Sequence, residues 1–387
     1  MQHIVIVGGG IMGSCLAYHL ALAGAAGDVV VIEPDPTYAF AATPRAVGGI
    51  RLQHALWENV EMSLYSDGIY ADFANQVTGG AVQYDPQFYR MGYLYLVQGA
   101  AQVARLQAVA DMQQARGVRV ERLDQAALRR RYPSFYFNDA DAGTLTPDDG
   151  QIDPHAALMG FRRAAEGRGV RYVKDRVVGL ELADGLVRRA HLAGGDRLGV
   201  DTLVNVANCW AGEICAMVGA ALPVEPRQRQ QFFFDTKAEL EPIPAMRHAS
   251  GQAMRRLRAG LIVGHTPKEQ VSGFDWALDP AIFEEVLWPE LAAQSRAFEA
   301  IRMKGGWVGH YDMCLLDGNP VIDRLPEVAN FIVAAGFSGH GLQHAPAVGR
   351  AIKEMILDGG FHSIDLSRLG YRRVVENTPL PDDGPAA

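Results

Sequence analysis

Residues 1–33 constrain the fold more than any other stretch of the chain. A short apolar run, Ile4 to Val7, leads into Gly8-Gly9-Gly10-Ile11-Met12-Gly13. A stretch of helix-forming residues then connects this segment to a second apolar run that ends at Glu33. This order predicts a strand, a tight turn, a helix and a second strand, which together make one β-α-β unit.

The glycines of the turn have the spacing G-x-G-x-x-G. Gly8 allows the tight turn, Gly10 lets the backbone approach a pyrophosphate at the positive end of the helix, and Gly13 lets helix and strand pack closely. Glu33 follows Gly13 by twenty residues, where a carboxylate accepts ribose hydroxyls. Because all four parts are in register, the segment predicts a dinucleotide site rather than an ordinary glycine-rich turn. The acid also disfavours a 2′-phosphate, which it would repel.

Length and charge narrow the class of protein. A chain of 387 residues exceeds what one hydrophobic core serves, so two domains are expected. The net charge of −8 makes nucleic acid a poor partner, because affinity for nucleic acid comes from basic patches. No apolar run has membrane-spanning length, and the N-terminus lacks the positive region of a signal peptide. The four cysteines match no redox or zinc pattern, which predicts packed reduced thiols, no metal site and a cytoplasmic protein.

Hydrophobic patterning predicts the elements of the first half of the chain. Helices are predicted over residues 57–76, 100–116 and from Pro154 to about Arg168. Strands are predicted over residues 91–97, 170–173, 176–182, 186–192 and 203–207, with a short helix over 210–218. The segment 133–150 is predicted to be a solvated acidic loop that contains Asp139, Asp141, Asp148 and Asp149.

The pattern changes after Pro223. Short strands at residues 231–234, 261–263 and 306–308 lie between Pro/Gly loops, with one helical stretch near 279–300, which predicts a second, antiparallel sheet. A buried strand at 331–335, a glycine loop at 336–341 and a helix to about Leu357 follow. A strand–loop–helix unit thus opens the chain and another closes it. This predicts a nucleotide domain built from both ends, with a second domain inserted.

The closing segment resembles a known family. Gly336-Phe337-Ser338-Gly339-His340-Gly341, followed by Ala345-Pro346 and Gly349, is similar to the C-terminal flavin loop of the D-amino acid oxidase superfamily, which includes glycine oxidase and sarcosine oxidase. The resemblance extends to the opening glycine loop, to Gly48-Gly49-Ile50-Arg51 and to Gly150-Gln151-Ile152-Asp153-Pro154. It implies FAD, oxidation of a C–N bond, and an α/β fold in which a Rossmann-type FAD-binding domain is interleaved with an antiparallel-sheet α+β substrate domain.

The resemblance also implies where the domains lie. The FAD-binding domain is expected over residues 1–84, 151–220 and 323–378, the substrate domain over 85–150 and 221–322, and a flexible tail over 379–387. Within the superfamily, the chain most resembles the FAD-dependent oxidoreductase domain-containing proteins linked to assembly of respiratory complex I, and their bacterial relatives. The segments 306–312, 341–346 and 361–366 carry that closer match.

The family pattern implies which residues contact FAD. They come from the opening loop, the 45–50 loop, the middle strands and the closing loop: Gly8, Gly10, Ile11, Met12, Gly13, Glu33, Arg45, Gly48, Gly49, Ile50, Val177, Ala207, Trp210, Gly309, Gly336, Ser338, Gly339, His340, Gly341, Leu342 and Gln343. Sarcosine oxidases attach their flavin through a cysteine where this chain has His310, so noncovalent FAD is expected, with a histidyl link at His310 left open. Relatives usually carry Gly at position 208; Asn208 tolerates positive φ, so the turn is expected to survive.

The substrate site departs from sarcosine oxidase in two ways. In sarcosine oxidase-like enzymes, an arginine at the position of Arg51 holds the substrate carboxylate together with a lysine, which is Gln343 here. The carboxylate clamp is therefore weaker or the substrate different. A second lysine, which helps oxygen react, is replaced by Ile262, which favours a dehydrogenase with another electron acceptor. Four residues are candidates for catalysis or for lining the substrate pocket: Arg51, His265, Tyr311 and His340.

Three functions stay open at this point. The leading hypothesis is an FAD-dependent amine dehydrogenase or oxidase that transfers a hydride from a small or N-substituted amino acid to flavin, giving an imine that hydrolyses. Its expected partners are the amine substrate and an electron acceptor (oxygen or another carrier), and a protein partner is left open. The second is a non-catalytic flavoprotein that acts in binding or assembly. The third is a 2-hydroxy acid dehydrogenase with His340 or His265 as the base. NAD in place of FAD is the weakest alternative.

Overall fold

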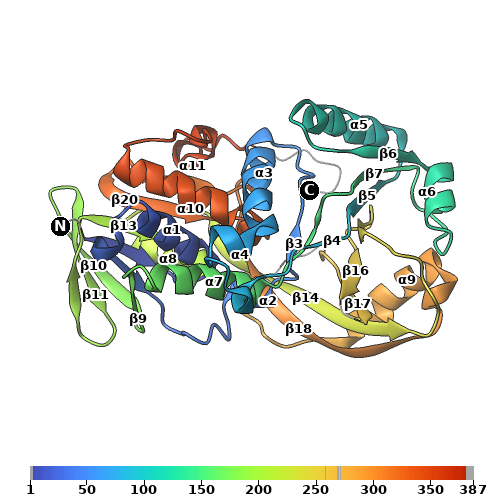
Figure 1. Ribbon diagram of the computed structural model, residues 1–387, viewed down its shortest axis with the longest axis horizontal. Helices are drawn as coiled ribbons and strands as arrows, with labels where there is room; N and C mark the ends of the chain where they lie inside the picture. The colour runs from blue at the N-terminus through green and yellow to red at the C-terminus, as the bar shows by residue number, and fades with distance from the viewer. Residues whose placement is uncertain (1–2, 258, 268–269, 271, 381–387) are drawn as a thin grey trace.

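A six-stranded sheet holds both ends of the chain together in the computed structural model, which describes residues 3–257, 259–267, 270 and 272–380 (Figure 1). The strand order is β19 (Val321–Leu325), β20 (Val328–Ala335), β13 (Thr202–Asn205), β1 (Ile4–Val7), β2 (Val29–Ile32) and β9 (Arg171–Val173). All neighbours are parallel except β19 and β20. The predicted opening and closing units are therefore confirmed as parts of one sheet.

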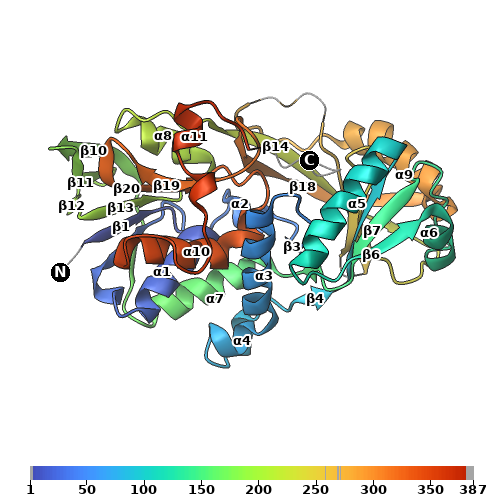
Figure 2. The ribbon, with the colours of Figure 1, turned by 90° about the horizontal axis from the view of Figure 1, so that it is seen from above.

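Both faces of this sheet are covered, which explains why its strands are continuous apolar runs. Ile4 and Ile6 of β1 point into one core, and Val5 and Val7 point into another. The first core lies under four packed helices: α1 (Ile11–Leu22), α3 (Trp57–Ala71), α7 (Pro154–Glu166) and α10 (Gly341–Leu357) (Figure 2). The second lies under α8 (Ala211–Ala216) and a small sheet of β10 (Val177–Ala183), β11 (Leu186–Leu192) and β12 (Arg197–Gly199).

The predicted second sheet has eight strands and lies at the other end of the molecule (Figure 1). Its order is β18 (Ile301–Cys314), β14 (Val224–Thr236), β17 (Gly260–Gly264), β16 (Ala253–Leu257), β15 (Ala245–Arg247), β5 (Tyr93–Val97), β7 (Ala142–Thr146) and β6 (Glu121–Asp124). Only the pair β15–β5 is parallel. Three helices flank this sheet: α5 (Ala100–Ala115), α6 (Gln125–Arg131) and α9 (Trp288–Gln294) (Figure 2).

The two large sheets meet through short connecting elements. A three-stranded sheet joins β3 (Gly49–Ile50), β8 (Gly150–Gln151) and β4 (Tyr89–Arg90). Near its end, β18 forms an isolated bridge from Met313 to Phe337, so the antiparallel sheet contacts the closing glycine loop. The remaining helices are short: α2 (Ala42–Arg45), α4 (Phe73–Gln76) and α11 (Arg372–Val375). The segments that contact each other here are far apart in sequence, which is what brings one site together.

Several local predictions were wrong. The helix expected over residues 57–76 is interrupted at Asp72, and the stretch near 279–300 divides into a π-helical turn at Ile282–Leu287, α9 and a short 3₁₀ turn. The expected solvated loop at 133–150 contains β7, and its Asp149 is fully buried. β7 pairs with β5 along one edge and with β6 along the other, so the sheet satisfies its backbone hydrogen bonds in spite of the polar composition of the segment.

The C-terminal tail differs in part from the expectation. Residues 381–387 lie outside the described residues, whereas Leu380 is held by backbone contacts to Asp317 and Asn319. The four cysteines are buried free thiols. Among the helices that the structure describes, none has the length and apolar character needed to cross a membrane. The division into domains at 84/85, 150/151, 220/221 and 322/323 stays a prediction.

Candidate active site

One cavity of about 1390 Å³ lies between the two large sheets. Most of the residues expected to contact FAD or substrate line it: Gly8, Gly10, Ile11, Met12, Glu33, Arg45, Gly48, Gly49, Arg51, Val177, Ala207, Trp210, Gly309, Tyr311, Ser338, Gly339, His340, Gly341, Leu342 and Gln343. The cavity is larger than a typical single-ligand pocket of about 300–1,000 Å³. It therefore has room for a dinucleotide and a second small molecule.

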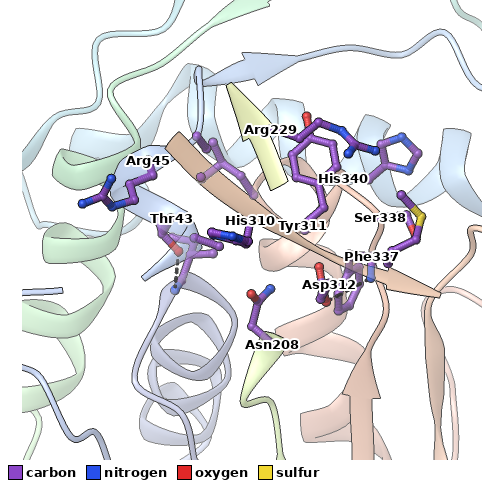
Figure 3. A pocket seen from close by; sticks show the side chains of 18 of the residues that line it. Thr43, Arg45, Asn208, Arg229, His310, Tyr311, Asp312, Phe337, Ser338 and His340 are labelled. Carbon is purple, nitrogen blue, oxygen red and sulfur yellow. Dashed lines mark hydrogen bonds between the residues drawn. The ribbon is translucent and has the colours of Figure 1, made fainter. Parts of the chain in front are cut away.

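The opening loop is built so that only glycine fits at its ends. Gly8 has φ +108°, and a Cβ there would lie 2.7 Å from the carbonyl oxygen of Val206. A Cβ on Gly13 would lie 1.9 Å from the carbonyl oxygen of Gly8. Gly10 caps the N-terminus of α1, whose first backbone N–H groups face the cavity, and Thr43 Oγ1 accepts one of them from Ile11 at 3.3 Å (Figure 3). These are the features of an anion site at a helix N-terminus.

Glu33 lies at the end of β2, as the motif predicts. Its carboxylate accepts backbone N–H bonds from Gly9 at 2.8 Å and from Asp35 at 3.0 Å. Burial raises the pKa of the Glu33 carboxyl, and these two backbone hydrogen bonds oppose that shift. Each carboxylate oxygen keeps a lone pair for another donor, so Glu33 can still accept ribose hydroxyls.

The closing loop is held by Asp312, a residue that sequence reasoning missed. One oxygen of its buried carboxylate, Oδ2, accepts the backbone N–H groups of Gly336 and Phe337 at 2.8 and 3.1 Å. Burial raises the pKa of Asp312 to about 6, against the lowering effect of those hydrogen bonds. Gly339 has φ +96°, and a Cβ there would lie 2.5 Å from the ring of Tyr311. The loop thus directs the N-terminus of α10 at the cavity (Figure 3).

The 39–45 segment is tied to β18 by Arg45. Its guanidinium donates to the carbonyl oxygen of Ala39 at 2.8 Å and to that of Val308 at 2.7 Å. It also lies over the ring of Trp276, with 4.9 Å from Cζ to the ring centroid. Arg45 therefore joins the 39–45 segment to the antiparallel sheet at the edge of the cavity, a structural contact that its sequence position did not indicate.

The turn after β13 keeps its shape. Asn208 adopts φ +53°, so the expectation that it replaces a glycine in the left-handed region is confirmed. Trp210 follows in the cavity wall and stacks on Phe274 with ring centroids 4.9 Å apart. The nearby His310 accepts the backbone N–H of Asp275 at Nε2, and burial lowers the pKa of its imidazole.

Arg51 and His340 meet inside the cavity although 289 positions separate them. Arg51 donates to the carbonyl oxygen of Gln53 at 2.6 Å and to Nε2 of His340 at 2.7 Å. A guanidinium can only donate, so His340 is a neutral imidazole with its proton on Nδ1. The Arg51 guanidinium also lies over the ring of Tyr95, at 5.6 Å from Cζ to the centroid. These contacts fix the orientation of Arg51 in the wall.

A second polar cluster adjoins this pair and was not predicted. Gln343 Nε2 donates to Nε2 of His54 at 2.6 Å and lies 3.2 Å from Nε2 of His344. Burial, with the nearby charge of Arg51, lowers the pKa of His54 well below its usual value. His54 is therefore neutral. Gln343, which stands where sarcosine oxidase-like enzymes have a lysine, hydrogen-bonds to His54. No spacing rule connects positions 54 and 343, so this contact could not be predicted from local sequence patterns.

Asp149 is the buried acid of this half of the site. It accepts the backbone N–H of Leu52 at 2.9 Å and a hydrogen bond from the hydroxyl of Thr146. Burial raises the pKa of Asp149 to about 8, although the hydrogen bonds and the charge of Arg51 lower it. At neutral pH the Asp149 carboxyl is therefore largely protonated and does not provide a negative charge to balance Arg51.

Four predicted residues do not line the cavity. Gly13 and Gly336 act through backbone packing and hydrogen bonding, and Ile50 is buried in the core under α1. The placement of His265 in the pocket was wrong. On β17, Ile262 faces the cavity, whereas Leu261 and Val263 face the opposite core, and His265 continues that opposite face by the period of two.

The geometry fits FAD. A glycine loop that a Cβ would obstruct, a partly buried acid at the end of β2 and a helix N-terminus at the closing loop lie along one cavity. These match the pyrophosphate, the adenosine ribose and the electron-rich end of a flavin dinucleotide in turn. The residues in place would hold the cofactor without a further domain.

Comparisons with known proteins agree with this geometry. The family model described as DAO, FAD dependent oxidoreductase, matches residues 3–355. The chain is 33% identical to FAD-dependent oxidoreductase domain-containing protein 1 of Xenopus laevis, over 97% of this chain and 83% of that protein. It is 24% identical to 4-methylaminobutanoate oxidase (formaldehyde-forming) of Paenarthrobacter nicotinovorans, over 94% of this chain and 45% of that protein.

A solved structure shows the same fold. L-proline dehydrogenase from P. horikoshii superposes with a TM-score of 0.87 at 24% identity, over 98% of this chain and 99% of that one. The expected α/β architecture with a parallel sheet and an antiparallel sheet is confirmed.

Proposed function

Because the chain belongs to the DAO family of FAD-dependent oxidoreductases, we propose that it oxidises the C–N bond of a small or N-substituted amino acid. FAD is its cofactor, and the chemistry that FAD supplies when bound is two-electron oxidation by acceptance of a hydride. The product is an imine that water hydrolyses. We propose further that FAD is held without a covalent bond, since burial raises the pKa of the nearby Cys209 thiol well above its usual value and disfavours the thiolate.

The observation that carries the proposal is the position of Arg51. Its guanidinium lines the cavity beside the closing loop, held from one side by Gln53 and from the other by His340. A guanidinium fixed in this way is suited to bind a carboxylate with parallel hydrogen bonds. An amino acid substrate supplies that carboxylate, and the ring of Tyr95 beside Arg51 supplies an apolar surface for the rest of the molecule.

The residues also support a particular division of roles. Arg51 binds and orients the acid, while the neutral His340 keeps Arg51 in place. Oxidation of a neutral amine by hydride transfer needs no side-chain base, which suits a site whose histidines His54 and His340 are both neutral. Ile262 presents an apolar side chain to the cavity where a lysine would help oxygen react, so an acceptor other than oxygen is favoured.

The relative with a methylated amine in its name supports the same class. 4-Methylaminobutanoate carries a carboxylate and a methylamino group, and the enzyme named for it is similar to 94% of this chain, which covers 45% of that enzyme. Similarity at this level supports an N-substituted amino acid as the substrate class.

Oxidation of a 2-hydroxy acid is a second candidate, and His340 is the observation in its favour. That reaction needs a base for the hydroxyl proton, and a neutral imidazole beside a carboxylate-binding arginine is such a group. The Nε2 lone pair of His340 already accepts from Arg51, however, so His340 has to give up this bond before it takes a proton. Amine oxidation requires no such rearrangement.

An anaerobic titration separates the two. The FAD-loaded protein is mixed without oxygen with amino acids, N-methyl amino acids, cyclic imino acids and 2-hydroxy acids, and the absorbance of oxidised flavin is followed. Bleaching by an amine family and not by the matched hydroxy acid is expected. Bleaching by hydroxy acids alone would refute the C–N proposal, and admitting air afterwards measures how slowly oxygen accepts the electrons.

A further inference from the structure

Three arginines other than Arg51 line the cavity wall that the antiparallel sheet provides. Arg229 lies on β14, Arg247 on β15 and Arg255 on β16. Arg247 pairs with Ala253, so Arg255, two residues further along β16, is its diagonal neighbour on the same face of the sheet. Arg229 lies beyond β17, which separates β14 from β16, but it lines the same cavity, and the charge of Arg247 acts on it.

These guanidinium groups are withdrawn from water without a balancing acid. Arg229 and Arg255 are each only 6% exposed. Within the described ranges, none of the three forms an ion pair with a carboxylate. A buried cation without a counter-charge is costly, and like charges nearby add to the cost. Burial lowers the pKa of Arg229, and the charge of Arg247 lowers it further.

Each of the three also presents a buried N–H group that no described residue accepts. These are Nε of Arg229, Nε of Arg247 and Nη1 of Arg255. The other contacts of Arg229 are the carbonyl oxygen of Gln228 and Oε1 of Gln270, both at 2.8 Å. A buried donor without an acceptor is destabilising, and these three residues line the cavity, so their N–H groups favour a ligand that supplies acceptors there.

Two tyrosines connect this group to Arg51. The rings of Tyr93 and Tyr95 stack on β5 with centroids 5.4 Å apart. The Arg51 guanidinium lies over Tyr95 at 5.6 Å, and the Arg255 guanidinium lies over Tyr93 at 5.4 Å and donates to its hydroxyl at 3.2 Å. A pair of aromatic rings thus has one cation over each member. The two rings and the two guanidinium groups together form a surface that suits a short ligand with an acid at both ends.

We propose that the substrate is a dicarboxylate, with one carboxylate bound by Arg51 and the second by Arg255 together with Arg229 and Arg247. The inference rests on the proposed function, since it names the substrate class of the same site as an N-substituted amino dicarboxylic acid. A carboxylate accepts from several donors at once, which matches guanidinium groups that line one cavity and keep N–H groups without an acceptor. The protonated Asp149 leaves the positive charge of the wall in place for it.

Binding of acids that cannot be oxidised tests this without turnover. Calorimetry of the FAD-loaded protein compares succinate, glutarate and adipate with butyrate, pentanoate and hexanoate, which have the same chain lengths. At least one dicarboxylate should bind 10-fold or more tightly than its matched monocarboxylate, the size expected for one added charge-assisted contact. Equal affinities at every length would overturn the inference, and a phosphonocarboxylate that binds far more tightly than every dicarboxylate would overturn the assignment of a carboxylate.

Matched variants locate the second acid. Arg255→Gln should reduce the preference for a dicarboxylate about 10- to 100-fold and leave monocarboxylate affinity within about 3-fold. Arg256→Gln is the control, because Arg256 is the next residue of β16, does not line the cavity, and donates to the carbonyl oxygen of Leu240. A preference that survives Arg255→Gln, or that falls equally in Arg256→Gln, contradicts the proposal.

Arg247→Gln is a second variant, which separates the loss of a ligand contact from the loss of the folded structure. The backbone of Arg247 pairs within the sheet, whereas its side-chain Nε has no acceptor among the described residues, so its replacement should preserve FAD content and still weaken the dicarboxylate. The two proposals fail separately. If amines bleach the flavin but dicarboxylates have no advantage, only the second-acid inference falls. If dicarboxylates bind through Arg255 and no amine bleaches the flavin, only the proposed oxidation falls.

Discussion

Replacing Gly13 by alanine tests the geometry on which the cofactor site depends. Gly13 lies in the first turn of α1, directly above the turn that Gly8 makes at the end of β1. An added Cβ would lie 1.9 Å from the carbonyl oxygen of Gly8, far inside van der Waals contact. Both partners are backbone, so no side chain can rotate away. The helix has to move off the strand, and the N–H groups at its N-terminus move with it.

Two opposing energies decide whether Gly13→Ala stabilises or destabilises the protein. Alanine in a helix is favoured over glycine by about 0.8–1 kcal/mol. Overpacking of a close contact costs about 1–3 kcal/mol, and more where only the backbone can yield. The overlap at Gly13 should therefore outweigh the gain in propensity. A shift of the anion site also weakens FAD binding, and a loss of about 1.4 kcal/mol there is a 10-fold weaker affinity.

Gly68→Ala is the matched control. Gly68 is exposed in α3, and a Cβ there meets nothing within 4 Å. The same substitution should raise thermal stability there, because only the propensity gain applies. Thermal unfolding and the ratio of flavin to protein absorbance measure both effects. Gly13→Ala should unfold earlier and retain less FAD, and Gly68→Ala should unfold later with full FAD. A Gly13→Ala protein with unchanged FAD content and unfolding temperature would refute the close-packing argument.

Three further predictions follow from the site. Asp149→Asn should make stability less dependent on pH. Burial raises the pKa of this carboxyl from 3.8 to about 8, so the native protein binds a proton that the unfolded chain releases, and wild-type stability falls as pH rises from about 4 to 8. Denaturant midpoints measured across that pH range test this, and the same dependence of the midpoint on pH in both proteins would contradict it. Arg51→Lys should raise the concentration of acid needed for half-maximal flavin bleaching about 10-fold or more, because one ammonium cannot replace the held guanidinium; an unchanged value means that Arg51 does not bind the acid. Acid precipitation should release all FAD into the supernatant, whereas a yellow pellet after washing would establish a covalent link, with His310 the first residue to examine by peptide mass spectrometry.

The opening and closing units could be predicted from sequence because their determinants are local. The strand, glycine turn, helix and acid of residues 4–33 are contiguous, and each glycine is needed for a steric reason that applies in any such turn. Asn208 could be predicted for the same reason, since positive φ depends on one residue and its neighbours. Resemblance to a family then supplied the link between the two units, which no local rule gives.

The substrate half of the site could not be predicted because its contacts are not local. Arg51 and His340 are brought together by two loops that enclose the cavity, and Arg255 and Tyr93 by strand pairing within one sheet. His265 shows how a small error matters: Ile262 lines the cavity, so His265, an odd number of residues further along, falls on the opposite face of the strand. Asp149 shows that polar composition does not exclude burial when a partner strand and two hydrogen bonds accept the residue.

Identification of the product of a single turnover tests the central claim most directly. The FAD-loaded protein is mixed anaerobically with one equivalent of the amine that bleaches it best, quenched with acid, and analysed by mass spectrometry for released amine and carbonyl compound. The account predicts one released amine and one carbonyl per flavin reduced, as hydrolysis of an imine requires. Flavin reduction with the C–N bond of the substrate intact would contradict it.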